Sequence, residues 1–296
     1  MAINTIEYAA VFQKELDRQI LEGSTSGWME ENAGQVIYNG GKEIKIPVVS
    51  TQGLADYNRD TGYSTGAVTF TYETYKMSQD RGRRFRLDAV DVDETSFALS
   101  AANVTGEFQR TRVIPEIDAY RYSKLAEQAK LKKTYTPAAN TVLSQLTSQL
   151  GEIMDIIGDE GEVVVVISRP VYDILISSPE IMKTIDIGSF KQGEVDFEVR
   201  YLNGACLIPV PSSRMKTAYT FKSSDDGGFA PAAGAKDINW IICPKNAPIA
   251  VSKTDNVKII TPENNQFADA WDIDYRKYHD LFLPKNKQNV VAVNTK

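Results

Sequence analysis

The stretch DVDETSFALSAANVTGEFQRTRVIPEIDAYRYSKLAEQAK, residues 91–130, decides how the rest of the chain is interpreted. Apolar residues recur in it at helical spacing, and Asp93 is a suitable N-cap. Pro115 removes one backbone donor, so we expect a kink there rather than a helix end. The stretch predicts one bent helix spanning roughly 55 Å at about 1.5 Å per residue. Its apolar positions are Phe97, Ala101, Val104 and Phe108, followed after the proline by Ile117, Tyr120 and Leu125.

A helix of that length exceeds what most compact domains need and can serve as a backbone for other layers. Periodicity alone favours a bent core helix in an ordinary α+β protein. The 296 residues, 42% hydrophobic and 24% charged, fit one large or two modest globular domains. A formal net charge of -6 argues against a free nucleic-acid binder. Neither a signal peptide nor a membrane span is indicated, so we expect a soluble intracellular chain.

Residues 1–40 have the composition of an arm. Residues 3–21 form a short amphipathic pattern, and the glycine-rich stretch after them has little periodicity, so we expect one helical piece and an extended remainder. Trp28 and Met29 lie in that weak context. Either they pack on the chain's own domain, or the arm packs them on a neighbouring subunit.

Two alternating runs, residues 43–49 and 67–77, predict the strands of a long hairpin. The connection STQGLADYNRDTGYSTG, residues 50–66, is polar and rich in turn residues, so we expect a mobile tip. A lone two-stranded hairpin is only marginally stable, which favours a partner subunit as its cover. Tyr57 and Tyr63 are the expected anchors, because aromatic side chains contribute most of the contact energy at such surfaces.

A charge switch follows the hairpin, with four arginines and then four carboxylates. One interpretation is two solvated faces, and another is pairing of the arginines with carboxylates of an adjacent subunit. Nucleic-acid binding is weakly indicated, because no aromatic residues are interleaved. A calcium loop lacks its glycine and distal glutamate. The residues are Arg81, Arg83, Arg84 and Arg86, then Asp88, Asp91, Asp93 and Glu94.

Residues 137–249 predict an α/β block. An apolar stripe from Val142 to Ile157 predicts a helix, and the run VVVVI, residues 163–167, predicts a strand buried on both faces. Pro170 starts another helix, and Asn203-Gly204 predicts a hairpin. Residues 223–235 are a flexible loop by composition.

The chain ends in a series of predicted strands. We expect the last two, residues 274–283 and 290–293, to pair with each other and to pack on the long helix. The α/β block is then an insertion between the helix and the C-terminal strands. The earlier strands of the series are residues 239–243, 249–253 and 257–260.

Catalytic signals are weak. His279 is the only histidine, and no G-x-S-x-G, P-loop or G-x-G-x-x-G is present. We interpret His279 as structural or surface-exposed and expect no catalytic residue, metal or cofactor. Cys206 and Cys243 give no disulfide framework and are expected in the core.

The order of these parts resembles the major capsid proteins of tailed bacteriophages, the Hong Kong 97-type fold. The segments RRFRLDAVDVDET, VIPEIDAYRYSKLA and AWDIDYRKYHDLFLPKNKQNVVAV look like phage coat sequences. The resemblance covers nearly the whole chain and implies an α+β fold. Its implied parts are an N-terminal arm (1–40), an extended loop (41–87), a peripheral domain with a spine helix (88–136 and 250–296) and an inserted axial domain (137–249).

The resemblance implies a coat protein that self-assembles as hexamers and pentamers into an icosahedral shell around double-stranded DNA, without specific DNA binding. Residues 3–21 are too short for a scaffolding segment, which leaves a separate scaffolding protein or a prior cleavage. Portal and head accessory proteins are implied as further partners. The implied location is the virion, assembled in the bacterial host cytoplasm away from membranes. Lys42, Lys45 and Lys76 lie where some relatives crosslink, but nothing marks one of them as reactive.

Two alternatives stay open. An encapsulin-like compartment has the same fold and holds protein cargo. An enzyme would need a deep pocket of perturbed titratable groups around His279.

Overall fold

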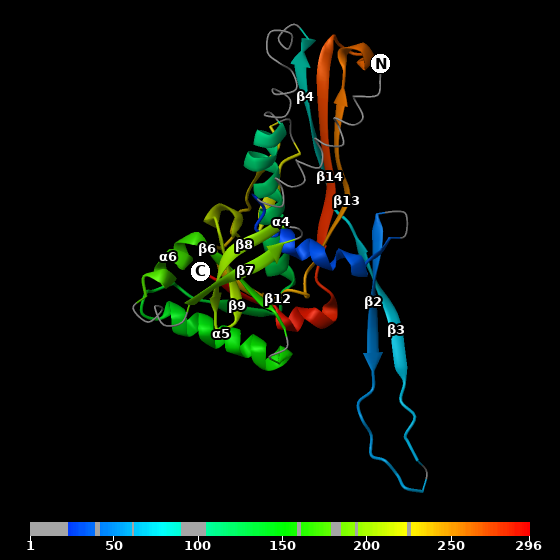
Figure 1. Cartoon of the computed structure of the whole chain (residues 1–296), viewed down its shortest axis with the longest axis vertical. Coiled ribbons are helices and arrows are strands. Elements are labelled where there is room, and N and C mark those ends of the chain that lie inside the picture. Colours follow the sequence, from blue (N-terminus) through cyan, green and yellow to red (C-terminus); the bar gives the residue numbers. More distant parts are fainter. Residues whose placement is uncertain are drawn as a thin grey trace.

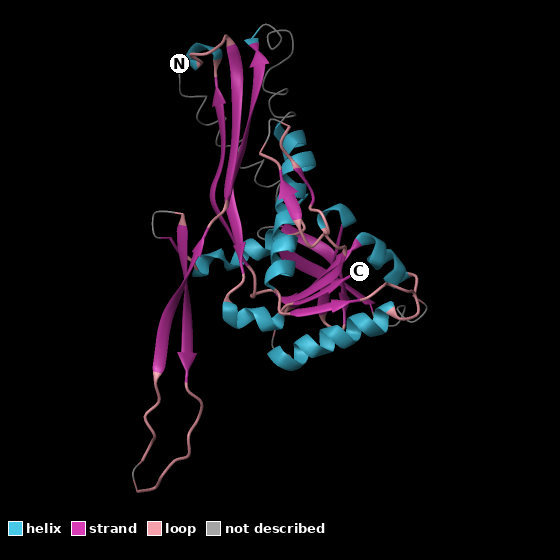
Figure 2. Cartoon of the chain, turned by 180° about the vertical axis from the view of Figure 1, so that it is seen from behind, coloured by secondary structure: helices cyan, strands magenta, loops and turns pink. Residues whose placement is uncertain are grey.

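The computed structural model describes residues 23–38, 42–60, 62–89, 105–158, 161–178, 185–192, 195–223 and 226–296. It contains a seven-stranded sheet with helices against it, a three-stranded sheet, and a hairpin that extends away from the body (Figure 1). Seen from behind, the hairpin and the far end of the three-stranded sheet lie at opposite ends of the long axis (Figure 2). The fold is mixed α+β, as the sequence predicted.

The predicted long helix is described from Thr105 onward. A π-helical turn, η2 (Gln109–Val113), leads into α4 (Ile114–Gln128), with Pro115 in the first turn of α4. The helical run therefore passes through the proline, as expected, and the wider π turn lies just before it. Ile117, Tyr120 and Leu125 are buried, as their spacing predicted. Asp93, Phe97, Ala101 and Val104 lie outside the described residues, as does the predicted arm helix at residues 3–21.

The seven-stranded sheet has the order β5-β15-β12-β6-β9-β8-β7. Every residue of β6 (Val163–Ser168) is buried, which confirms the strand covered on both faces. Val163, Val165 and Ile167 pack with the stripe of α5. On the other face, Val164 and Val166 share a cluster with α4 and with Trp28 and Met29. The elements are α5 (Val142–Ile157), α6 (Arg169–Ile176), β5 (Leu131–Thr134), β7 (Ile185–Gln192), β8 (Val195–Leu202), β9 (Ala205–Val210), β12 (Ile238–Pro244) and β15 (Ala292–Thr295).

The Asn203-Gly204 turn joins β8 to β9 with φ values of 48° and 81°, so the predicted hairpin is confirmed. The predicted flexible loop at residues 223–235 is partly wrong. It contains β11 (Phe229–Pro231), which pairs antiparallel with β10 (Tyr219–Phe221). The strand forms because Phe221 and Phe229 stack across the pair, with ring centroids 6.3 Å apart.

The three-stranded sheet has the order β13-β14-β4 and corrects two expectations. The arginine-rich segment, which was expected within the extended loop (41–87), is a strand of this sheet, β4 (Gln79–Asp88). The last two strands do not pair with each other. β14 (Ala270–Phe282) pairs with β13 (Ile249–Ile260) and β4, whereas β15 enters the seven-stranded sheet between β5 and β12. β15 is placed there because Ala292 and Val293 fill the cores on opposite faces of that sheet.

The predicted long hairpin is confirmed. β2 (Glu43–Thr51) and β3 (Val68–Lys76) pair antiparallel along their whole length, from Glu43 opposite Lys76 to Thr51 opposite Val68. A two-residue strand, β1 (Ile37–Tyr38), adds to β2. The segment before it is a 3-10 helix, η1 (Gly27–Gln35), where an extended arm was expected. Short 3-10 turns complete the chain: η4 (Ser212–Arg214), η5 (Pro262–Asn264) and η6 (Lys285–Val290).

Candidate assembly surface

The hairpin of β2 and β3 has a firm root. Ile44, Ile46 and Met77 are buried in a cluster with residues of β13 and β14. Tyr75 stacks on Phe282, with ring centroids 5.1 Å apart. The hairpin therefore leaves the body in a fixed direction, because its base belongs to the chain's own core.

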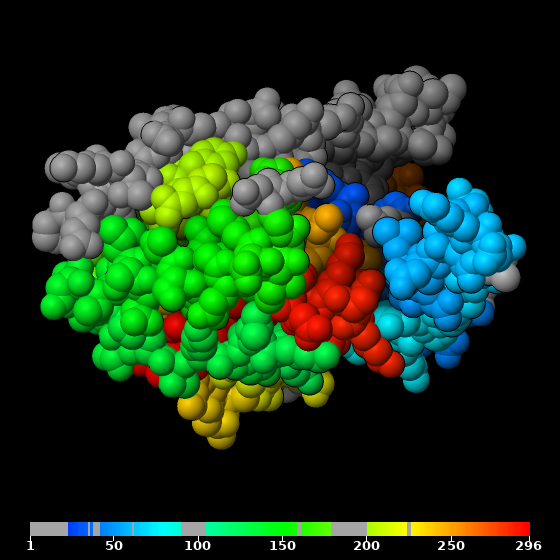
Figure 3. Space-filling view, turned by 90° about the horizontal axis from the view of Figure 1, so that it is seen from below, coloured from blue at the N-terminus to red at the C-terminus, as the bar shows by residue number. Residues whose placement is uncertain are grey.

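Beyond the root, one face of the hairpin is apolar and exposed. Val49 is opposite Phe70 in the register, and Pro47 is opposite Tyr72. Phe70 is 56% exposed and Tyr72 is 50% exposed, and their rings meet edge to face. Figure 3, seen from the hairpin end, shows the hairpin (blue to cyan) standing to one side of the body. We call Pro47, Val49, Val68, Phe70 and Tyr72 the hairpin face.

The tip carries the two tyrosines that the sequence singled out. Tyr57 and Tyr63 are exposed and contact each other edge to face, with ring centroids 4.9 Å apart. Asn58 and Gly62 pair across the turn, and Gly62 adopts a φ of 82°. Leu54 is fully exposed beside them, a position that the sequence analysis did not select. An aliphatic residue in a polar tip was the available signal for it.

The structure packs Trp28 on its own subunit. Its side chain is fully buried in the core that also holds Met29, Tyr122 and Leu125. The intramolecular alternative is therefore the one the structure shows, and Trp28 is not available to a neighbour in this conformation. η1 brings it to the sheet, and Asn32 fixes η1 by donating to the backbone oxygens of Lys245 and Pro248.

The arginine cluster finds partners within the chain, and a contact with a neighbour's carboxylates stays a prediction. Arg84 and Arg86 each form a two-pronged contact, with Asp274 and Asp272 across the β4–β14 pair. The hydrogen bond from Arg86 lowers the pKa of Asp272. Arg81 pairs with Glu116 on α4 and donates to the backbone oxygens of Lys222 and Gly228. Arg83 lies near Gly227, where a Cβ would meet its Nη1 at 3.4 Å.

His279 has a structural environment. It is 5% exposed, and its ring meets Tyr120 edge to face at 5.6 Å. Burial, reinforced by the charges of Arg121 and Lys277, lowers its pKa well below 6.5. Its neighbour Asp280 is occupied by the hydroxyl of Tyr120, which donates at 2.6 Å. No serine is joined to His279 by a hydrogen bond in the described ranges, so the expected structural role fits the geometry.

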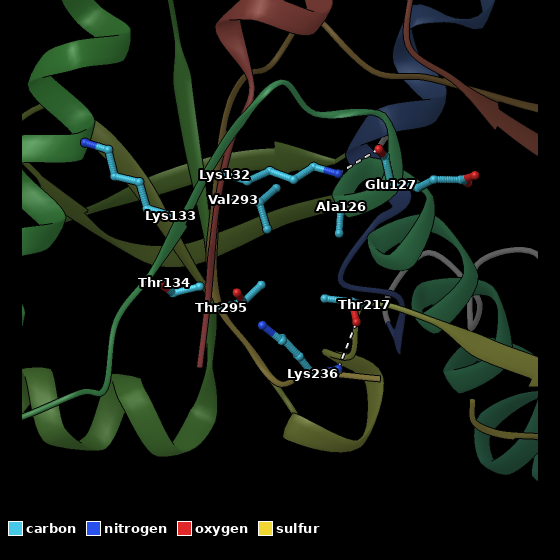
Figure 4. A pocket seen from close by; sticks show the side chains of 9 residues that line it. All are labelled: Ala126, Glu127, Lys132, Lys133, Thr134, Thr217, Lys236, Val293 and Thr295. Atoms are coloured by element: carbon cyan, nitrogen blue, oxygen red, sulfur yellow. Dashed lines mark hydrogen bonds between the residues drawn. The ribbon is translucent and has the colours of Figure 1, made fainter. Parts of the chain in front are cut away.

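A cavity of about 370 Å³ lies beside β5 and is lined by three lysines and three threonines (Figure 4). Lys132 donates to the backbone oxygen of Glu127, and Lys133 turns away to pair with Glu152. Glu127 is the acidic residue in the lining, and its carboxylate pairs with Lys124 rather than with Lys236.

Metal ligands and membrane-spanning helices remain to be considered in the described part of the chain. No group of three or more His, Cys, Asp or Glu side chains there is placed to hold a metal ion. None of the helices in it is long and apolar enough to cross a membrane. Cys206 and Cys243 are buried, as predicted, and burial raises the pKa of each to about 12.

Comparison with solved structures shows which proteins share this fold. No protein-family model matches the sequence, and no curated protein is similar to it in sequence. The capsid of the cyanophage P-SCSP1u matches with a TM-score of 0.60 at 11% identity, over 87% of this chain and 84% of that chain. The mature capsid of bacteriophage PhiM1 matches with a TM-score of 0.58 at 12% identity, over 88% and 83%. A virus-like particle from Pyrococcus furiosus matches with a TM-score of 0.57 at 13% identity, over 97% and 99%. The chain therefore has the fold of phage capsid proteins.

Proposed function

We propose that this chain is the major capsid protein of a tailed bacteriophage, assembling as hexamers and pentamers into an icosahedral shell around double-stranded DNA. The hairpin face carries the proposal. Its root is anchored in the subunit's own core, yet Phe70 and Tyr72 stay half exposed on a strand pair that projects from the body. An apolar surface held out in this way is stable when a second copy covers it.

The parts of the fold support assigned roles. The hairpin of β2 and β3 serves as the extended loop, and α4 with the three-stranded sheet serves as the peripheral domain. The α/β block serves as the axial domain, whose loops meet around the capsomer axes. We assign three strands to these parts by their sheet. β4 belongs with the three-stranded sheet, whereas β5 and β15 belong with the seven-stranded sheet.

The partners follow from these roles. Copies of the same chain form capsomers and the shell, and a separate scaffolding protein, a portal and head accessory proteins complete the head. DNA is enclosed without specific binding, which suits a chain with a formal net charge of -6. The expected location is the virion, after assembly in the host cytoplasm. The chain acts as a structural protein and not as an enzyme.

A second candidate is a protein compartment of the same fold that encloses protein cargo, as encapsulins do. The match to the Pyrococcus furiosus virus-like particle favours it, because that match covers 97% of this chain and 99% of the other. Particles purified from cells separate the two proposals. Nuclease-protected double-stranded DNA supports the phage shell, and a co-purifying enclosed protein without DNA supports the compartment.

The test of shell formation is electron microscopy of the purified chain, with a scaffolding protein supplied where one is encoded nearby. The variant Phe70→Ser with Tyr72→Ser removes the aromatic part of the hairpin face. Burial of apolar surface contributes about 25 cal/mol per Å². Loss of each aromatic ring should therefore weaken association by roughly 2–3 kcal/mol per subunit. We expect closed particles from the parent and free subunits or capsomers from the variant.

The matched control is Thr69→Ser with Thr71→Ser, on the opposite face of the same strand. It should assemble like the parent, and all three proteins should unfold at similar denaturant concentrations. Shells formed equally well by the Phe70 and Tyr72 variant would show that the hairpin face is not an assembly contact. A parent that stays a monodisperse monomer at high concentration, across salt and with scaffold present, would overturn the proposed function.

A further inference from the structure

A buried polar cluster joins the N-terminal segment to α4. Asp118 on α4 is fully buried and accepts hydrogen bonds from the hydroxyls of Ser24, Thr25 and Ser26 at 2.9, 2.8 and 2.6 Å. It also accepts from the backbone nitrogens of Thr25 and Ser26 at 3.1 and 3.2 Å. Three consecutive hydroxyl residues thus surround one carboxylate, which is the donor set that a buried anion needs.

Two arginines balance the charge of this cluster. Arg214, from η4, pairs with Asp118 at 2.9 Å. Arg121, one turn of α4 after Asp118 and 1% exposed, donates to the backbone oxygen and hydroxyl of Ser26 and pairs with Glu30. Desolvation opposes the ionised form of Glu30, but the charges of Arg121 and Lys277 and the hydrogen bond from Arg121 together outweigh it, so the pKa of Glu30 is lowered. Two carboxylates and two guanidinium groups, contributed by η1, α4 and η4, therefore meet around residues 24–30.

The neighbouring contacts lock the same segment in place. Tyr122 donates from its hydroxyl to that of Thr25 at 2.9 Å. At Gly23 the chain passes so close to α4 that a Cβ would lie 2.8 Å from Cδ1 of Ile114. Immediately after the hydroxyl triplet, Trp28 and Met29 enter the core. The triplet therefore lies within a segment that α4 and the core hold closely.

We propose that Asp118, with Arg121 and Arg214, forms a built receptor for residues 24–26 and holds the segment 24–35 on the subunit. Asp118 is a positioning residue. Its carboxylate keeps residues 24–35 docked on their own subunit, and replacing it with a neutral side chain releases them with Trp28. The attachment depends on this charge, because removing one anion leaves buried cations without a partner and favours the open, hydrated state. The inference concerns the free subunit and stands independently of shell formation.

The test is Asp118→Asn, which keeps the side-chain shape but loses the charge and one acceptor atom. Hydrogen exchange by mass spectrometry on the unassembled subunit compares residues 24–35 with β6. We expect exchange in residues 24–35 to accelerate roughly tenfold to a hundredfold, with β6 unchanged. Trp28 emission should shift to longer wavelength, with Trp28→Phe identifying its share of the signal.

Two further variants keep the proposal falsifiable. Ser24→Ala with Ser26→Ala removes two donors from the segment, leaves α4 intact, and should accelerate exchange at the same residues. Asp155→Asn removes an exposed carboxylate from α5 and should change nothing. The proposal fails if residues 24–35 keep parent-like protection in both cluster variants. It also fails if β6 loses protection in parallel, since Asp118 would then support the whole fold rather than the docking of one segment.

Discussion

The single histidine allows a clean test of how the core responds to pH. Burial holds the pKa of His279 well below 6.5, and the facing groups reinforce this, since Arg121, Lys277 and Arg81 are cations. The unfolded chain takes up a proton near pH 6.5, whereas the folded chain does not. The stabilising contribution of the neutral imidazole is therefore complete above pH 6.5 and declines as the pH falls toward the folded pKa. The slope is about 1.4 kcal/mol per pH unit.

Between pH 7.5 and 5.5 this predicts a loss of about 1.3 kcal/mol that belongs to His279 alone. The assay is urea unfolding of the unassembled subunit at both pH values, for the parent and for His279→Gln. Carboxylates contribute to both proteins equally, so the difference between the two pH responses isolates the imidazole. The parent should lose about 1.3 kcal/mol more than the variant. Parallel losses would show that the folded chain protonates His279 as readily as the unfolded chain, and the reasoning from burial would be wrong.

Two further predictions concern the hairpin tip and the arginine strand. Deleting residues 55–63 should leave the subunit folded and weaken assembly, because Tyr57 and Tyr63 are exposed beyond the anchored root. Electron microscopy reads the assembly, and strong exchange protection of the tip in the free subunit would contradict it. Reversing Arg84 and Arg86 to Glu should lower the unfolding free energy, since each new carboxylate faces an aspartate of β14. Denaturant unfolding reads this, and unchanged stability with lost assembly would restore an inter-subunit role for the pair.

Elements with a strong local signal could be predicted from the sequence. The stripe of α5, the continuous β-branched run of β6 and the Asn203-Gly204 turn each carry their geometry within a few residues. The hairpin of β2 and β3 belongs to the same class, because both strands alternate and a turn-rich segment separates them. Local periodicity decides such elements wherever one face is buried.

Long-range pairing could not be predicted. In β4, Phe85 and Leu87 alternate with the arginines, so a strand signal was present but was outweighed by the charge density. The partners of Arg84 and Arg86 lie 190 and 186 residues further along, where no local pattern identifies them. β15 is similar. Its four residues indicate a strand, but which of two sheets receives it depends on cores that the whole chain builds.

Some candidate contact residues have partners within their own subunit, whereas others stay exposed to solvent. Trp28 and the arginines of β4 were candidates for contacts with a neighbour, and both find buried or charged partners within the chain. A group that is already paired gains little from a second subunit, because its desolvation cost has been met and its partner is near. The hairpin face differs, since Phe70 and Tyr72 stay half exposed on a strand pair whose root is rigid. Association therefore has most to gain at the hairpin, and the charged ladder of β4 and β14 serves the fold of the subunit that carries it.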